Sequence, residues 1–240
     1  MNTIITKNAQ ELAEKAAEWI TEIVSETLKK QDRFTIVLSG GSTPKLLHNL
    51  LASERYRDRI DWSKMHFFWG DERFVPFEDE RNNARMAFET LLDKVPVNKK
   101  NIHVMQTTGP EPEESAADYE KMLRNYFEGQ ANSFDLVLLG LGNDAHTLSL
   151  FPGYPVVFEN QRWVSAFYLE QQKMYRITLT APVVNRASHV AFLVSGGDKA
   201  AALFHVLAGE HDPALYPAQI IQPFQGEAKW FIDEAAAADL

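Results

Sequence analysis

The stretch Phe134-Asp-Leu-Val-Leu-Leu-Gly-Leu-Gly-Asn-Asp-Ala-His-Thr-Leu-Ser-Leu-Phe-Pro152 joins a wholly apolar run to glycines and then to Asp144 and His146. An apolar run bounded by turn residues is typical of a central strand in a parallel sheet covered on both faces. Ligands of such sheets bind at the carboxyl ends of the strands. Asp144 and His146 are therefore candidate catalytic residues, histidine being the side chain whose unperturbed pKa lies near neutrality. The alternative is a loop with a solvated aspartate and a histidine that caps a short helix.

The length and composition favour one large α/β domain over residues 1–240. The chain is 45% hydrophobic and 24% charged, as in an ordinary globular protein, and no segment has the composition of a linker.

The absence of cysteine excludes disulfides, thiolate nucleophiles and Cys-ligated metals. The first fifteen residues lack a basic segment followed by an apolar one, and no run approaches the roughly 18 apolar residues of a membrane span. We therefore expect a cytoplasmic protein without a membrane partner.

The formal net charge of -9 argues against a nucleic-acid partner, because nucleic acid is bound by clustered Lys and Arg. Any phosphate site must then be built locally, from backbone N–H groups and a few cations, against an unfavourable overall field.

Apolar residues at helical spacing predict an amphipathic helix over 9–30. After it, strands and helices alternate, which predicts parallel strand pairs with helical crossovers on both faces of the sheet. The fold class is thus α/β, a three-layer α/β/α arrangement with a mostly parallel, Rossmann-like central sheet. The predicted strands are 34–38, 65–69, 102–105, 136–139, 163–167, 175–180, 189–194 and 228–232, and the predicted helices are 44–51, 83–92, 113–127 and 198–207.

Two segments share one plan, in which an apolar strand ends in Ser-Gly-Gly and a helix starts at once. They are Leu38-Ser-Gly-Gly-Ser-Thr-Pro-Lys-Leu-Leu47 and Val194-Ser-Gly-Gly-Asp-Lys-Ala-Ala-Ala-Leu203. In the first, Gly40 and Gly41 permit a backbone path closed to other residues, and Ser42 or Thr43 can cap the helix. A helix N-terminus after glycines is a natural phosphate site, whereas the structural alternative is a tight connection with an ordinary cap. The positive charge of Lys199 at a helix N-terminus opposes the helix dipole. A bound anion would offset this unfavourable interaction, which favours the phosphate hypothesis.

Asp71, Glu72 and Arg73 follow another apolar strand and so fall at a carboxyl end. Arg73 could hold a phosphate, because guanidinium suits bidentate oxyanion recognition. The alternative is a surface turn with internal ion pairing, which for Glu72 is at least as well supported. Arg176 either reaches the site or forms a buried ion pair within its strand.

Several classes of site lack their motif. No histidines or acidic residues have the spacing of a zinc or iron site, and no Gly-x-Ser-x-Gly elbow, P-loop or Gly-x-Gly-x-x-Gly is present. His48, His205 and His211 are interpreted as surface groups.

Taken together, these residues make the chain resemble the 6-phosphogluconolactonase family, within the larger group that includes glucosamine-6-phosphate deaminases. The resemblance extends from Ser39 to Asp233, and several ordered motifs are more specific than any one of them. They are Ser39-Gly-Gly-Ser-Thr-Pro44, Asp71-Glu-Arg73, Asn82-Asn83, Gly140-Leu-Gly-Asn-Asp-Ala-His-Thr-Leu-Ser-Leu-Phe-Pro152, Arg176-Ile-Thr-Leu-Thr180, Ser195-Gly-Gly-Asp-Lys199 and Trp230-Phe-Ile-Asp233.

The resemblance implies hydrolysis of 6-phospho-D-glucono-1,5-lactone to 6-phosphogluconate, the second step of the oxidative pentose phosphate pathway, without metal or cofactor. His146 would be the general base on water, and Asp144 would orient it. Phosphate would be held by Ser39, Gly40, Gly41, Ser42 and Thr43 together with Arg73 and Lys199, with Asp71 and Arg176 nearby. The resemblance favours a monomer, although the exposed face of the N-terminal helix leaves a dimer open.

One position departs from the family pattern, because Ala145 stands where the family has glycine in Asp-Gly-His. If that position needs a positive φ, alanine costs on the order of 1 kcal/mol and could displace His146.

Two rival functions remain. Glucosamine-6-phosphate deaminases resemble the chain at Asp71 and at Asp144 to His146, but they carry an acidic residue at the position of Phe151 and usually Tyr at that of Arg73. A sensor that binds sugar phosphate without catalysis would need a DNA-binding domain, and the 38 residues before the first glycine turn are too few for one. A catalytically inactive relative stays open because of Ala145.

Overall fold

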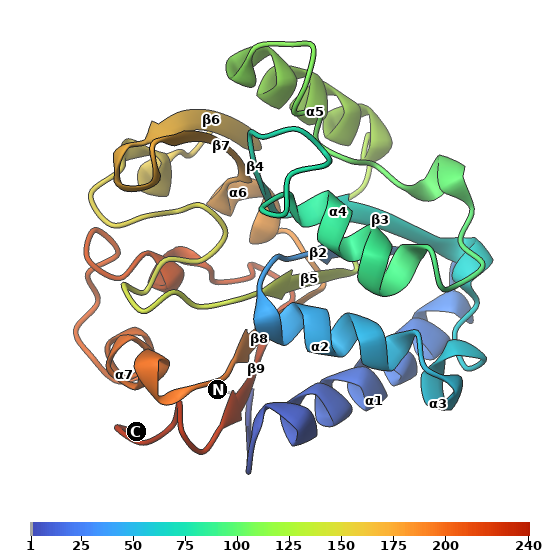
Figure 1. Ribbon diagram of the computed structural model, residues 1–240, viewed down its shortest axis with the longest axis horizontal. Coiled ribbons are helices and arrows are strands. Elements are labelled where there is room, and N and C mark those ends of the chain that lie inside the picture. The colour runs from blue at the N-terminus through green and yellow to red at the C-terminus, as the bar shows by residue number, and fades with distance from the viewer. Residues whose placement is uncertain (1) are drawn as a thin grey trace.

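The computed structural model describes residues 2–240, and its core is a parallel six-stranded sheet (Figure 1). The strand order is β1-β9-β8-β5-β2-β3. The strands are β1 (Asn2–Thr6), β2 (Phe34–Leu38), β3 (Met65–Trp69), β5 (Leu136–Leu139), β8 (His189–Val194) and β9 (Glu227–Asp233). Every residue of β2 and of β5 is buried, as expected for central strands covered on both faces.

Helices lie on both sides of this sheet. On one side are α1 (Ala9–Leu28), α2 (Ser42–Leu51) and the short α3 (Glu54–Arg57), and on the other is α5 (Pro112–Tyr126) (Figure 1). Helix α1 begins after Asn8, whose side chain accepts a hydrogen bond from the Glu11 N–H at 3.0 Å, and it buries residues at helical spacing. The predicted three-layer α/β fold is confirmed.

A second, antiparallel sheet of three strands stands beside α5, in the order β4-β7-β6. Its strands are β4 (Asp71–Arg73), β6 (Val164–Leu169) and β7 (Met174–Leu179). Two of the predicted strands therefore lie outside the parallel sheet. Only residues 170–173 separate β6 from β7, which is too short for a parallel crossover, so the two strands form a hairpin.

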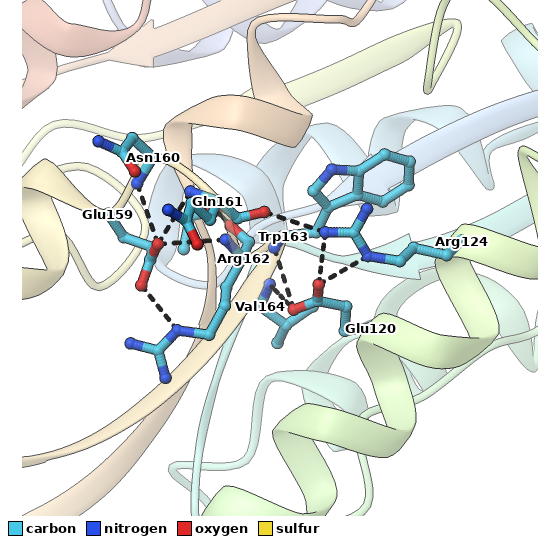
Figure 2. A network of polar contacts seen from close by, with 9 residues as sticks. Glu120, Arg124, Glu159, Asn160, Gln161, Arg162, Trp163 and Val164 are labelled. Atoms are coloured by element: carbon cyan, nitrogen blue, oxygen red, sulfur yellow. Dashed lines mark hydrogen bonds and ion pairs between the residues drawn. The ribbon is translucent and has the colours of Figure 1, made fainter.

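Polar contacts fix α5 to the start of β6 (Figure 2). The Glu120 carboxylate accepts hydrogen bonds from the Trp163 and Val164 N–H groups at 3.0 and 3.2 Å. Arg124 pairs with Glu120 and also donates to the Gln161 carbonyl at 3.0 Å. These contacts tie the small sheet to α5.

One predicted strand is absent, and two observed strands are not among the predicted ones. Residues 102–105 form no strand: Ile102 makes one isolated bridge to Phe67, and His103 stacks on Phe68 with ring centroids 4.6 Å apart. The apolar alternation there reflects packing along the β3 edge. Conversely, the predicted strands include neither β1, which pairs in parallel with β9, nor the short β4, which pairs antiparallel with β7.

The predicted helices differ from the observed ones mainly at their ends. The helix predicted over 83–92 is α4 (Asn83–Ala87) continued by a π-helical turn, Phe88–Leu92. The helix predicted over 198–207 is α7 (Ala200–Leu207), preceded by a 3₁₀ turn, Gly197–Lys199. The short helices α3 and α6 (Ala181–Val184) are not among the predicted ones.

His48 is fully buried, so its interpretation as a surface group is wrong. Its Nδ1 lies 3.1 Å from the Thr90 hydroxyl of the π-helical turn, and burial lowers its pKa to about 4. No helix within residues 2–240 is long and apolar enough to cross a membrane.

The order of strands along the sheet reverses next to β2. From β2 the chain goes to β3 on one side, and it later returns to β5 on the other side and continues outward through β8 and β9. Open α/β sheets bind their ligands at such a reversal point, outside the carboxyl ends of the strands. The topology therefore places a site beyond Leu38 and Leu139.

Candidate active site

A cavity of about 250 Å³ lies at this reversal point. The residues that follow β2 form one wall of it and those that follow β5 form another, while β4 and β7 contribute from the small sheet. Eight residues predicted for the site line this cavity: Ser39, Gly40, Gly41, Asp71, Arg73, His146, Arg176 and Lys199.

Asp144 and His146 form a hydrogen-bonded pair in the loop that follows β5. The Asp144 Oδ1 lies 2.5 Å from the His146 Nδ1, and His146 lines the cavity. Burial opposes ionisation of Asp144, but the hydrogen bond from His146 and its charge outweigh burial and lower the pKa of the carboxyl. An ionised carboxylate accepts the Nδ1–H, so the neutral imidazole keeps its lone pair on Nε2.

The plane of the His146 ring is set by Phe151. The two rings stack with centroids 4.1 Å apart and an interplanar angle of 25°. The Arg176 guanidinium lies 5.9 Å from the same Phe151 ring. Phe151 therefore gives the imidazole an apolar neighbour close to a buried cation.

Ala145 has a φ of 63°, in the left-handed region that favours glycine. The position therefore does need a positive φ. The strained residue is held on both sides, since its N–H donates to the Gly142 carbonyl and its own carbonyl accepts from the Ala218 N–H, both at 3.0 Å. Alanine is accommodated here with the Asp144–His146 hydrogen bond intact.

The first Ser-Gly-Gly turn leads directly into α2. Gly41 has a φ of 110° and is the N-cap, and among residues 2–240 no side chain caps this helix. The prediction that Ser42 or Thr43 supplies a cap is wrong, because both already belong to the first turn of the helix. The first N–H groups of a helix have no partner within it, so this end of α2 can receive an anion from the cavity.

The second Ser-Gly-Gly turn is arranged differently, around Asp233 at the end of β9. The Asp233 carboxylate accepts hydrogen bonds from the Ser195 hydroxyl at 2.5 Å, from the Gly196 N–H at 3.0 Å and from the Ala236 N–H at 2.8 Å. The turn thus binds an anion that belongs to the protein itself. From this turn only Lys199 reaches the cavity, and its Nζ lies 2.9 Å from Asp198.

Three cations and one carboxylate give the cavity its charge. Arg176 is 3% exposed, and its Nη1 lies 3.6 Å from the Asp71 Oδ2, which also accepts from the Ser149 hydroxyl at 2.7 Å. Burial lowers the pKa of Arg176 to about 10, so the guanidinium stays charged at neutral pH. Arg73 is oriented by the Arg81 carbonyl at 2.8 Å. Together with Lys199, these residues make a locally positive site in an acidic protein.

Three predicted site residues do not line the cavity. They are Ser42 and Thr43, which lie in the first turn of α2, and Asp144, which lies behind His146. Sequence reasoning gave no role to three polar residues that do line it, Asn83, Thr147 and Gln172. The only indication of Asn83 in the sequence is that it belongs to Asn82-Asn83, one of the motifs on which the family resemblance rests. Gln172 lies on the turn between β6 and β7 and accepts a hydrogen bond from Arg176, a pairing with no signal in the sequence.

The fold and the cavity are those of an α/β enzyme, with His146 of the Asp144–His146 pair and the uncapped N-terminus of α2 at one cavity. The family model described as "Glucosamine-6-phosphate isomerases/6-phosphogluconolactonase" matches residues 7–230. The chain therefore belongs to this family.

Within that family, several similar proteins carry the lactonase name. The chain is 42% identical to the 6-phosphogluconolactonase of Synechocystis, over 97% of this chain and 95% of that one. It is 40% identical to the 6-phosphogluconolactonase of Nostoc, over 95% of this chain and 94% of that one. Among solved structures, a 6-phosphogluconolactonase from Trypanosoma cruzi superposes with a TM-score of 0.85 at 29% identity, covering 100% of this chain and 96% of that one.

Within residues 2–240, no group of three or more His, Asp or Glu side chains is placed to hold a metal ion. The expectation that the reaction needs neither metal nor cofactor stays a prediction.

Proposed function

We propose that this protein hydrolyses 6-phospho-D-glucono-1,5-lactone to 6-phospho-D-gluconate, with His146 as the general base. The observation that carries the proposal is that His146, hydrogen-bonded to Asp144 behind it, lines the same cavity as Gly41, the N-cap of the uncapped helix α2. A base and an anion-binding helix end in one cavity suit a substrate that has a reactive carbonyl and a phosphate.

In the proposed reaction, water attacks the lactone carbonyl carbon while the His146 Nε2 takes its proton. The tetrahedral intermediate collapses and breaks the bond between the carbonyl carbon and the ring oxygen. His146 returns its proton to that oxygen, which leaves as a hydroxyl group. The new carboxylic acid then loses a proton to solvent. Asp144 stabilises the imidazolium between the two transfers and keeps the ring in one tautomer.

Phosphate binding provides the orientation. The end of α2 after Gly41, together with Arg73 and Lys199, would hold the phosphate, while Arg176 and Asp71 face the remainder of the substrate. Contacts to the unreacting phosphate can hold the carbonyl against the attacking water, which is how remote binding energy accelerates a reaction.

Phe151 distinguishes the lactonase reaction from the deaminase reaction. Deaminases of this group carry a carboxylate at this position, whereas here an aromatic ring packs against His146. No acid stands there to transfer protons during ring opening and isomerisation, so the deaminase reaction lacks a group that it needs.

The test is the rate of lactone hydrolysis above the spontaneous background. We expect wild-type catalysis to fall about a thousandfold in His146→Ala, because a general base contributes roughly 10²- to 10⁴-fold. His211→Ala, at an exposed histidine, is the matched control and should retain the wild-type rate. Background rates in the wild type would contradict the proposal, and phosphosugar binding without turnover would then indicate a non-catalytic relative.

We also propose that the enzyme is a cytoplasmic monomer. The lack of cysteine agrees with a reducing compartment, and the family resemblance favours a single subunit. Sedimentation of the purified protein would test the oligomeric state.

A further inference from the structure

Glu72 is 1% exposed and lies next to the site residues of β4 without facing the cavity. Side chains alternate along a strand, so Asp71 and Arg73 point to one face of β4 and Glu72 to the other. Asp71 and Arg73 line the cavity. Glu72 makes no ion pair within residues 2–240, contrary to the internal pairing considered from the sequence. A buried carboxylate needs other partners.

Its partners are the first N–H groups of α4. The Glu72 carboxylate accepts hydrogen bonds from the Asn83 N–H at 2.7 Å and the Ala84 N–H at 2.8 Å, and from its neighbour, the Arg73 N–H, at 2.9 Å. The next N–H of the helix, that of Arg85, is bound by the Asn82 side chain at 2.8 Å. Glu72 therefore fixes where α4 begins relative to β4.

The residue held in this way, Asn83, bridges two walls of the cavity. Its Nδ2 donates to the Asp71 carbonyl at 2.9 Å, so its side chain is anchored to β4. Its Oδ1 lies against Gly40: a Cβ added to that glycine would be only 2.0 Å from this oxygen. Asn83 thus fills the space beside the glycine turn and sets how far that turn stands from Asp71 and Arg73.

We infer that Glu72 is a positioning residue for substrate binding: acting through Asn83, it holds the Ser39–Gly41 turn and the Asp71–Arg73 strand at a fixed separation across the cavity. It touches no substrate. The inference rests on the proposed function, in which the phosphate is bound between these two walls.

The informative variant is Glu72→Gln. Its amide NH₂ would face backbone N–H groups that need an acceptor, so the start of α4 and Asn83 would shift. Because His146 and Asp144 lie on a different loop, the chemical step should be largely spared. We expect KM for the lactone to rise about tenfold and kcat to stay within about twofold.

Two matched variants separate positioning from stability. Glu89→Gln removes the same charge from the same segment, but at an exposed side chain paired with Arg85, and should leave KM unchanged. Ala87→Gly loosens α4 at a buried position without altering the acceptor and should lower the melting temperature without raising KM. If Glu72 had only a structural role, Glu72→Gln and Ala87→Gly would show the same KM and kcat whenever they lowered the melting temperature equally.

Binding of 6-phosphogluconate by calorimetry supplies a readout independent of turnover. A tenfold weaker Kd in Glu72→Gln, with Glu89→Gln unchanged, supports the inference even if the wild type proves inactive as a lactonase. An unchanged Kd and KM in Glu72→Gln would overturn the inference. A fall in kcat as large as the rise in KM would also overturn it. A wild type without hydrolysis would instead contradict the proposed function alone.

Discussion

The two Ser-Gly-Gly turns have the same sequence plan and opposite uses. Ser39-Gly-Gly opens α2 with Gly41 in the left-handed region, and its helix end faces the cavity without a capping side chain. Ser195-Gly-Gly places Gly196 in that region, with a φ of 104°, and closes around the Asp233 carboxylate. The local sequence makes both turns able to bind an anion. The second turn already holds an aspartate of the protein, whereas in the proposed function the first turn is left to receive a substrate phosphate.

The largest difference in activity between variants of the two turns should come from adding one methyl group to each turn. In Gly40→Ala the new Cβ would lie 2.0 Å from the Asn83 Oδ1, whereas in Gly197→Ala the nearest atom is 3.7 Å away. We expect kcat/KM to fall about a thousandfold in the first variant, by displacement of the phosphate turn, and less than about twofold in the second. Steady-state kinetics on both variants measures the contrast, and similar losses would contradict it.

Across the cavity from the first turn, β4 should make the stability of the protein depend on pH through Glu72. Burial raises the pKa of Glu72 to about 7, despite three N–H donors that favour its carboxylate. The folded state then holds this proton between pH 4.5 and 7 while the unfolded state has lost it, so the group makes folding less favourable as pH rises through that window. Relative to Glu72→Gln, the wild type should lose on the order of 3 kcal/mol of unfolding free energy over this range. The check is urea denaturation of the wild type and Glu72→Gln at several pH values. If Glu72 does not titrate in this range, the unfolding free energies of the two proteins will change in parallel with pH.

Removing the charge of Asp233 should destabilise the second turn without weakening substrate binding in the cavity. In Asp233→Asn, the Ser195 hydroxyl and the Gly196 and Ala236 N–H groups lose a charged acceptor. We expect the free energy of unfolding to fall by about 2 kcal/mol, with KM changed less than about threefold. Glu234→Gln, at the exposed neighbour, serves as the control in urea denaturation. A large rise in KM with unchanged stability would mean that this turn serves the substrate after all.

Lys199 is the contribution of the second turn to the cavity, so its removal should affect binding alone. In Lys199→Met we expect KM to rise about tenfold, the loss of one charged contact to phosphate, with the melting temperature unchanged. Lys121→Met, on the exposed side of α5, should behave as the wild type. An unchanged KM in Lys199→Met would remove the second turn from the site altogether.

The smallest expected effect concerns the turn after β5, which places alanine where the other two turns use glycine. In Ala145→Gly, release of the left-handed alanine at φ 63° should raise stability by no more than about 1 kcal/mol, because glycine also loses more entropy on folding. Ala145→Val should instead lower stability by roughly 1–2 kcal/mol. Thermal denaturation would contradict the strain argument if glycine proved the less stable of the two small residues.

The residues predicted from the sequence were those with local signals. The apolar runs of β2 and β5 and the glycines after them located the cavity, because strand, turn and helix start lie within one short segment. The role of Asp233 had no such signal, since it acts on a turn 38 residues earlier in the chain. The buried partner network of Glu72 also joins residues that are not neighbours, Asn83 lying 11 residues away. The second sheet was not predicted because β6 and β7 have apolar patterns that a parallel strand also shows, and because β4 is only three residues long.

The most direct test follows individual backbone amides of isotope-labelled protein by NMR while 6-phosphogluconate is added. Our account predicts large shifts for Gly40, Gly41, Ser42 and Thr43, whose N–H groups would meet the phosphate, and none for Gly196, which is already bound to Asp233. Shifts at Gly196 and Gly197 with silence in the first turn would contradict it.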